Sequence, residues 1–177
     1  KVEAEAVGRP PTLCAGCPHR GFFYQLSKVK DIVIAGDIGC YGLGGAPPLN
    51  AKDLCICMGA SPSIAHGLQE AFEFFGEKKR AVAVIGDSTF FHTGMNSLLH
   101  VAYNQSPVIT CILDNRITAM TGHQENPDSG FTLQGEPAQF VEIEPVVGAL
   151  CIKHVKTVKR LYQKAMKETL AWSMVMD

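Results

Sequence analysis

The stretch Ala81-Val-Ala-Val-Ile-Gly-Asp-Ser88 decides the fold, because five apolar residues run directly into a glycine, an acid and a hydroxyl. An apolar run of this length that ends in a turn signal predicts a buried strand. From Ala81 to Asp114 the chain carries only two charged residues, Asp87 and Asp114, where average composition would give about eight. Such a stretch predicts a strand that is covered on both faces, as in a parallel sheet.

Similar runs at 31–35 and 108–113 predict two more strands. The segments between the strands predict helices over 61–75 and 94–103, because their apolar residues recur at helical spacing. For the helix over 61–75, Ser61 is a typical N-cap residue and Pro62 is favoured in a first turn. Gly76 is typical of the position that ends a helix. Strands that alternate with helices indicate parallel pairing. We therefore expect an α/β fold with a doubly wound, mainly parallel sheet and helices on both faces.

The remaining chain predicts a long loop over 116–137, a helix over 138–149, a strand over 151–158 and a basic helix over 159–172. A loop of this length without secondary structure suggests a functional role. We expect one domain over 1–177, with 1–11 as an extended arm, because 177 residues is a usual size for a single core.

Composition excludes several classes of partner. A net charge of −1 favours neither nucleic acid nor an anionic membrane surface, and no apolar run reaches the length of a bilayer span. The start lacks the apolar segment of a signal peptide, so we expect a cytoplasmic protein. In that setting the seven cysteines indicate thiols, metal ligands or iron-sulfur ligands rather than disulfides.

Asp87 and Asp114-Asn115 both follow predicted strands, at the edge where open α/β sheets place their ligands. Gly86 allows a sharp turn, and the amides of a following helix would face a phosphate. Carboxylate and amide oxygens suit Mg²⁺ that bridges a diphosphate. Taken alone, Gly86-Asp-Ser88 could be only a tight turn, but its distance from Asn115 matches the thiamine diphosphate signature. Ser88 replaces the usual third glycine, and Asp114-Asn115 replaces Asn-Asn.

Five ordered motifs make the resemblance specific. They are Cys14-Ala-Gly-Cys-Pro-His-Arg20, Gly36-Asp-Ile-Gly-Cys40, Met58-Gly-Ala-Ser61, Gly86-Asp-Ser-Thr-Phe-Phe-His92 and Leu113-Asp-Asn-Arg-Ile-Thr-Ala-Met-Thr-Gly-His-Gln124. Together they resemble the thiamine diphosphate domain of 2-oxoacid:ferredoxin oxidoreductases, especially the alpha subunits of the indolepyruvate branch. After residue 124 the likeness is only architectural.

The resemblance implies a set of site residues. Mg²⁺ would be held by Asp87, Asn115 and the Ile117 carbonyl, and the diphosphate by Ser88, Thr118 and Thr121, with Gly86 at the turn. Gly59 would offer backbone to the aminopyrimidine ring of the cofactor. Met58 is either the apolar residue that wedges between the cofactor rings or an ordinary core residue.

Cysteines and histidines extend this set. Cys14 and Cys17 have the spacing of a ligand pair, and the resemblance adds Cys40 as a third ligand of a [4Fe-4S] cluster. The alternative is three free thiols that line the cofactor cleft. His19 could donate to a diphosphate oxygen, or be a capping or surface residue. His92 and His123 could face the substrate and transfer a proton near neutral pH.

The resemblance implies oxidative decarboxylation of a 2-oxoacid to an acyl-CoA, with coenzyme A as co-substrate and electrons passed to iron-sulfur clusters and ferredoxin. The activating glutamate belongs to a separate pyrimidine-binding domain, which we do not find here, so we expect such a domain or subunit as partner in an oligomer. The alternatives are a non-oxidative decarboxylase or synthase that uses the same cofactor, and a non-enzymatic nucleotide-binding or iron-sulfur protein. No Gly-x-Gly-x-x-Gly follows a strand, which disfavours dinucleotide binding.

Overall fold

The computed structural model describes residues 8–158 and 168–169 and has an α/β fold with helices on both faces of a parallel sheet, as expected. The strands are β1 (Ile32–Gly36), β2 (Arg80–Gly86) and β3 (Ile109–Leu113), in the spatial order β1-β2-β3. β2 pairs with both neighbours, with Val82 opposite Ile34 on one side and Ile109 on the other. The central position of β2 explains why its sequence is apolar on both faces.

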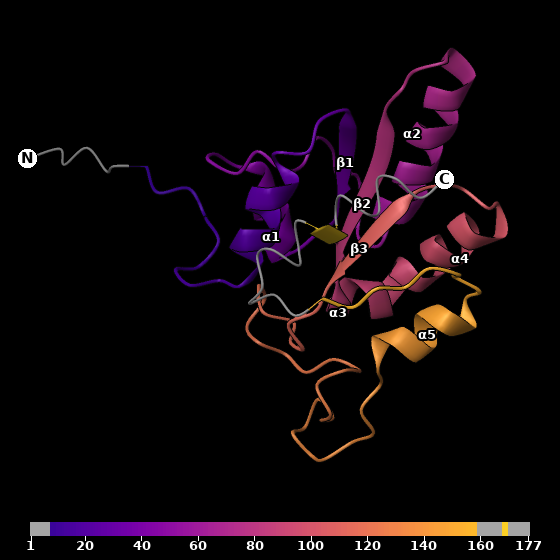
Figure 1. The fold of residues 1–177 in the computed structure, drawn as a ribbon. Coiled ribbons are helices and arrows are strands. Elements are labelled where there is room, and N and C mark those ends of the chain that lie inside the picture. The colour runs from indigo at the N-terminus through magenta and orange to yellow at the C-terminus, as the bar shows by residue number, and fades with distance from the viewer. Residues whose placement is uncertain (1–7, 159–167, 170–177) are drawn as a thin grey trace, which may run out of the picture.

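Two groups of helices enclose the sheet (Figure 1). One group holds the crossover segments, which are α2 (Ser61–Phe75) between β1 and β2, and α3 (Asp87–Thr89), η2 (Phe90–Gly94) and α4 (Met95–Tyr103) between β2 and β3. The other group holds α1 (His19–Leu26) and the 3₁₀ helix η1 (Cys40–Gly45). η2 is a single π-helical turn, a feature found often at functional sites.

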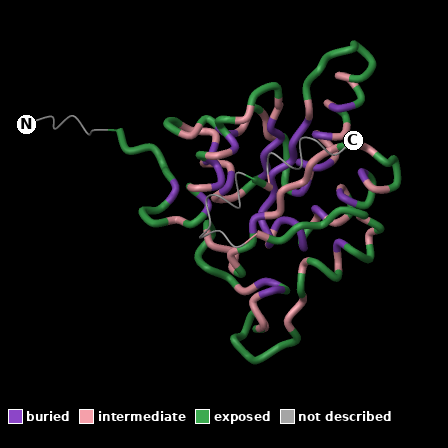
Figure 2. Tube along the Cα trace, viewed as in Figure 1, coloured by how far each residue is buried: buried purple, intermediate pink, exposed green. Residues whose placement is uncertain are grey.

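Successive residues of β2 pack against these two layers in turn. Val82 and Val84 share a cluster with Phe23 and Leu26 of α1, while the alanines at 81 and 83 face α2. Alanine leaves room for close approach of the α2 backbone, and the valines fill the wider gap under α1. Figure 2 shows the resulting band of buried chain through the centre of the fold.

Helix α2 begins differently from the prediction and ends as predicted. Ser61 is its first residue rather than its N-cap, and the Ser61 hydroxyl makes no hydrogen bond. The Ser61 amide instead donates to a carboxylate oxygen of Asp37, 2.9 Å away, so a residue from the end of β1 caps the helix. Gly76 ends the helix in the left-handed conformation, at φ 67°.

The chain after β3 departs further from the prediction. The helix expected over 138–149 is α5 (Ile143–Ala149), which starts later because Pro145 has no amide hydrogen and is tolerated only in a first turn. The strand expected over 151–158 is wrong, since these residues form no strand. Ile152 packs against the cluster around Phe90 instead, which partly buries its side chain without a strand partner.

Two expectations fall largely outside the described residues. Of the predicted arm over 1–11, only residues 8–11 are described, and they form no helix or strand. Of the predicted basic helix over 159–172, only residues 168–169 are described, and they are helical. No helix among the described residues has the length and apolar character needed to cross a membrane.

Candidate functional site

Each of the three strands ends directly before an aspartate. Asp37 follows β1, Asp87 follows β2 and Asp114 follows β3. Because the strands are parallel neighbours, these carboxylates lie along one edge of the sheet, as the sequence predicts for Asp87 and Asp114.

The two predicted cofactor loops meet through their hydroxyl groups. Ser88 Oγ lies 2.6 Å from Thr118 Oγ1, although the two residues are 30 positions apart. Ser88 is the second residue of α3, at the start of the helical run that continues through α4, and Thr118 lies in the loop after β3. The contact places two hydroxyl groups beside the N-terminus of that helical run. Hydroxyl groups and free backbone amides at a helix N-terminus can both donate to phosphate oxygens.

Asp87 is the buried centre of this edge, with only 1% of its surface exposed. The Tyr41 hydroxyl donates to Oδ1 at 3.4 Å, and Asn126 Nδ2 donates to Oδ2 at 3.2 Å. Burial raises the pKa of the Asp87 carboxyl, and the negative charge of Asp114 adds to this effect. A buried carboxylate with so little compensation would be stabilised by a cation.

His19 reaches Asp87 through one intermediate residue. It is the buried first residue of α1, and its ring meets the edge of the Tyr41 ring, with 5.0 Å between centroids. Burial raises the pKa of Tyr41, and the Asp87 carboxylate raises it further, so Tyr41 stays a neutral donor. The surface alternative for His19 is therefore excluded, and its contact with a diphosphate stays a prediction.

A second buried carboxyl, Asp128, joins the site from the loop between β3 and α5. One oxygen each of Asp87, Asp114 and Asp128 lie within 4.8 Å of one another, and we call these three residues the carboxylate cluster. Burial raises the pKa of Asp128 to about 7, and the charges of Asp87 and Asp114 contribute. Sequence reasoning missed Asp128, Asn126 and Tyr41, because none of them follows a strand or belongs to a ligand motif.

Hydrogen bonds within its own loop fix the backbone around Thr118. Asn115 Oδ1 accepts from the Ile117 amide at 3.3 Å, and Thr118 forms two backbone hydrogen bonds with Gln124. The Thr121 hydroxyl donates to Gln124 Oε1 at 2.6 Å on the exposed side of the loop. Thr118 is thus the loop residue that contacts Ser88, whereas the side chains of Asn115 and Thr121 form hydrogen bonds within their own loop, and their contacts with a cation or a diphosphate stay predictions.

The segment around Met58 is held over the site by backbone contacts. Met58 is 39% exposed, which excludes the alternative of a core residue. The Gly59 amide donates to Asp37 Oδ1 at 2.8 Å, and the Gly59 carbonyl accepts from Ser97 Oγ at 2.6 Å. Gly59 has φ 80°, and a Cβ there would lie 2.0 Å from Thr93 Oγ1, so only glycine suits this position.

The three motif cysteines lie near one another beside α1. Cys14 and Cys17 form a turn in which the Cys17 amide donates to the Cys14 carbonyl. Burial raises the pKa of the Cys40 thiol, and the neighbouring Cys14 and Cys17 raise it further. All seven cysteines are free thiols in the structure, which leaves both the cluster and the cleft-thiol interpretations open.

His92 and His123, the two histidines predicted to face the substrate, are exposed. His92 lies in η2, with Nδ1 3.3 Å from the hydroxyl of Thr93, and that hydroxyl donates to the Met58 carbonyl. His123 lies at the turn of the Thr118–Gln124 pairing, with φ 61°. His92 is thereby connected to the segment over the site, and both histidines are accessible to a bound molecule.

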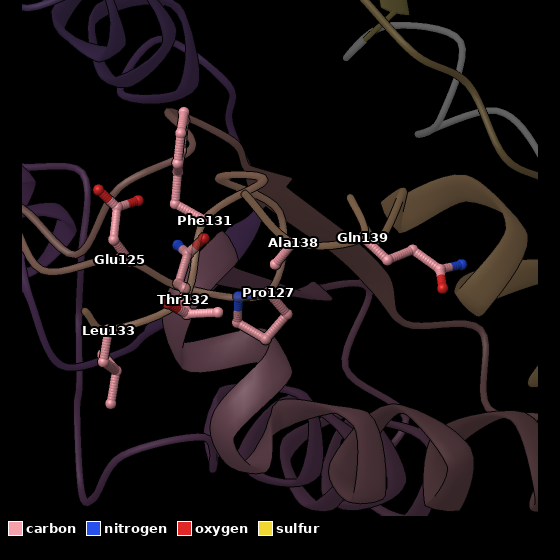
Figure 3. Close-up of a pocket in the computed structure, with 8 residues that line it drawn as sticks. Glu125, Pro127, Phe131, Thr132, Leu133, Ala138 and Gln139 are labelled. Atoms are coloured by element: carbon pink, nitrogen blue, oxygen red, sulfur yellow. The ribbon is translucent and has the colours of Figure 1, made fainter. Parts of the chain in front are cut away.

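An open hollow of about 360 Å³ lies beside the site, on the loop between β3 and α5 (Figure 3). Asn126 lines it, and Asn126 also donates to Asp87. Phe131 and Leu133 are exposed at this hollow, at 49% and 78%. The hollow contains none of the predicted cofactor residues, so it is a neighbour of the site and not the site itself.

Comparison with known proteins places this geometry in a family. Residues 37–175 match the model of the thiamine pyrophosphate enzyme, C-terminal TPP binding domain. The chain is 40% identical over 174 residues to indolepyruvate oxidoreductase subunit IorA of Archaeoglobus fulgidus, and 42% identical over 181 residues to that of Pyrococcus horikoshii. Each alignment covers 96% of this chain but only 27% and 28% of those relatives.

Solved structures show the same fold. The 2-oxoglutarate:ferredoxin oxidoreductase of Magnetococcus marinus superimposes with a TM-score of 0.74 at 19% identity, over 95% of this chain and 61% of that one. Benzoylformate decarboxylase of Polynucleobacter necessarius gives 0.59 at 15% identity, over 89% of this chain and 30% of that one. The family model spans most of the chain, including β2, β3 and their loops. This chain therefore belongs to the family of C-terminal TPP-binding domains of thiamine pyrophosphate enzymes.

Proposed function

We propose that the chain binds thiamine diphosphate and Mg²⁺ at the edge of the sheet, through the loops that follow β2 and β3. The observation that carries this proposal is the 2.6 Å contact of Ser88 with Thr118 beside the buried Asp87. The donor set fits, because it offers carboxylate oxygens to a cation and hydroxyl groups to a phosphate. A Cβ at Gly86 would overlap the Tyr41 ring, so the turn before Asp87 also requires glycine.

Each residue has a separate role in this proposal. Asp87, Asn115 and the Ile117 carbonyl hold the cation, and Ser88, Thr118 and Thr121 hold the diphosphate, with Thr121 released from Gln124. Met58 supports the bend of the cofactor, and Gly59 presents backbone to its aminopyrimidine ring. Exposure of the Met58 side chain and the fixed backbone of Gly59 support these two roles.

We further propose that the chain is part of a 2-oxoacid:ferredoxin oxidoreductase that acts on an indolepyruvate-like substrate. The names of the relatives with about 40% identity support this class over a non-oxidative decarboxylase, with which the chain shares only the fold. Thiamine diphosphate, when bound, would supply the carbanion chemistry that decarboxylation of a 2-oxoacid requires. The chain's own residues orient the cofactor, neutralise its diphosphate and place His92 and His123 where a proton could be transferred.

This enzyme would need partners that the described residues do not provide. We propose a pyrimidine-binding domain or subunit that supplies the activating glutamate, ferredoxin as electron acceptor, coenzyme A as acyl acceptor, and an oligomeric assembly. The exposed apolar residues around the site are compatible with a covering partner, since they include Ile38, Ile56 and Met120 at 45%, 71% and 50%. Cys14, Cys17 and Cys40 would contribute ligands to a [4Fe-4S] cluster in the assembled enzyme.

Calorimetric titration with thiamine diphosphate tests the binding proposal. With Mg²⁺ present we expect saturable binding at one site, and with EDTA we expect the heat of binding to disappear, because diphosphate and buried carboxylates repel without a cation. Thiamine without phosphates is the control ligand and should not bind measurably. Equal affinity for the cofactor with and without Mg²⁺ would contradict the proposed metal bridge.

A turnover assay tests the need for a second domain. We expect the 177-residue chain, supplied with thiamine diphosphate, Mg²⁺, coenzyme A and indolepyruvate, to reduce no low-potential dye. A full-length protein that also contains a pyrimidine-binding domain should reduce the dye under the same conditions. Decarboxylation of the 2-oxoacid by the chain alone would show that its active site is complete.

A further inference from the structure

Asp128 is a buried carboxyl that the proposed cofactor site does not use. It lies in the loop between β3 and α5 with 1% of its surface exposed. Neither of its carboxylate oxygens has a hydrogen-bond donor in the described part of the chain. A buried carboxylate without a donor is strongly unfavourable unless a cation or a proton compensates its charge.

The neighbours of Asp128 increase this cost. Its carboxylate group lies with those of Asp87 and Asp114, one oxygen of each being within 4.8 Å of the others. Repulsion among three carboxylates at such separations is strong where water is excluded. The side chains that oppose it are few, because Asn126 donates to Asp87 but not to Asp128.

Arg116 does not neutralise the cluster. Its Nε is 3.8 Å from Asp114 Oδ2, and the side chains of this pair are 64% and 40% exposed. The Arg116 guanidinium lies over the Phe140 ring, 4.7 Å from the ring centroid. An exposed pair of this kind contributes little, and although the charge of Arg116 also acts on Asp128, it offsets the charges of the two buried carboxylates only in part.

The loop that carries Asp128 is bonded directly to Asp87. The Asp128 amide donates to Asn126 Oδ1 at 3.1 Å, while Asn126 Nδ2 donates to Asp87 Oδ2. Asn126 thus fixes both carboxyl groups relative to each other, from two distant parts of the sequence. With Asp114 these two carboxyl groups offer three convergent oxygen atoms, which suit a hard divalent cation such as Mg²⁺, Mn²⁺ or Ca²⁺.

We propose that Asp87, Asp114 and Asp128 bind a divalent cation before any diphosphate is present, with Asp128 as the ligand that fastens the loop between β3 and α5 to the sheet. This inference rests on the proposed role of Asp87 in cation binding and adds two ligands to it. The cation would then be in place before the cofactor arrives, and it would supply the positive charge that a diphosphate needs beside these carboxylates.

Binding of Mn²⁺ alone tests this site, because Mn²⁺ gives an electron paramagnetic resonance signal that decreases when the ion is bound. We expect wild-type protein to bind one Mn²⁺ ion without thiamine diphosphate, with competition by Mg²⁺. Asp128→Asn should weaken Mn²⁺ binding by about tenfold or more, since the site loses one of its charged ligands. Glu136→Gln is the matched control, because it removes an exposed carboxylate from the same loop and should leave Mn²⁺ affinity unchanged.

Thermal unfolding separates a ligand from a merely structural residue. Mn²⁺ should raise the Tm of wild-type and Glu136→Gln protein but not of Asp128→Asn. Without metal, Asp128→Asn should have a Tm at least as high as wild type, because it removes an uncompensated buried charge. Asp114→Asn provides a second variant, with the same loss of Mn²⁺ affinity expected.

The outcomes distinguish this inference from the proposed function. If Mn²⁺ binds alone and thiamine diphosphate does not bind with Mn²⁺, the cation site stands and the cofactor proposal fails. If thiamine diphosphate binds with Mg²⁺ but Mn²⁺ alone does not bind, the three-carboxylate site is overturned. Wild-type affinity of both Asp128→Asn and Asp114→Asn for Mn²⁺ would overturn it as well.

Discussion

Replacing Asp87 with alanine is expected to abolish Mg²⁺-dependent binding of thiamine diphosphate, with a loss of affinity of at least about 100-fold, equivalent to about 2.7 kcal/mol. Asp87 is the buried member of the proposed cation site, and its side-chain hydrogen-bond partners, Tyr41 and Asn126, are both neutral donors. Neither donor can replace a charged ligand of Mg²⁺. Calorimetric titration with the cofactor at fixed Mg²⁺ measures the effect.

Asp87→Asn separates charge from shape. Asparagine can still accept from Tyr41, so the fold should persist, but the cation loses its charged ligand and affinity should fall nearly as far as in Asp87→Ala. Asp31→Asn is the control, because it removes an exposed carboxylate that lies before β1 at the opposite edge of the sheet. Unchanged affinity of Asp87→Ala for the cofactor would refute the proposed cation site.

The sequence was most informative where burial dictates composition. The three predicted strands agree with β1, β2 and β3 to within one residue at each end, because a central parallel strand must be apolar on both faces. The same reasoning placed Asp87 and Asp114 at one edge, since charge is tolerated in such a stretch only where a strand ends. The contact of Ser88 with Thr118 follows from that placement.

The sequence-based predictions failed where tertiary contacts, rather than the local sequence pattern, determine the structure. Residues 151–158 include the β-branched Ile152 and Val155, but a strand also needs a partner, and Ile152 is half-buried against side chains instead. Tyr41, Asn126 and Asp128 reach the site through a 3₁₀ helix and a long loop, whose paths depend on packing rather than on periodicity. The late start of α5 could have been predicted from the sequence. Pro145 is tolerated only in the first turn of a helix, so the helix cannot begin much before Ile143.

Asp37 has a long-range role that the local sequence pattern around Ser61 does not predict. Ser61-Pro62 resembles a helix start that caps itself, yet the cap comes from Asp37 at the end of β1. The Asp37 side chain is fully buried and accepts from the backbone amides of Ile38, Gly59 and Ser61, at 2.8, 2.8 and 2.9 Å. One carboxylate therefore fixes the end of β1, the start of α2 and the Gly59 segment over the site.

Asp37→Ala is accordingly expected to lower the free energy of unfolding by about 3 to 5 kcal/mol, because buried amides lose a charged acceptor. Asp53→Ala is the matched control. Asp53 is an exposed aspartate that accepts from a single amide, that of Ile34 at 2.7 Å, and its loss should cost about 1 kcal/mol. Urea unfolding of both variants, followed by circular dichroism, measures the difference.

A second readout links Asp37 to the site. In Asp37→Ala the Gly59 amide loses its acceptor, so thiamine diphosphate affinity should fall even under conditions where the variant remains folded. Asp37→Asn should lie between wild type and Asp37→Ala in stability, because its amide oxygen accepts but its NH₂ group faces other donors. If Asp37→Ala were no less stable than Asp53→Ala, the three amides would have other acceptors, and Asp37 would not be what holds the Gly59 segment against the edge of the sheet.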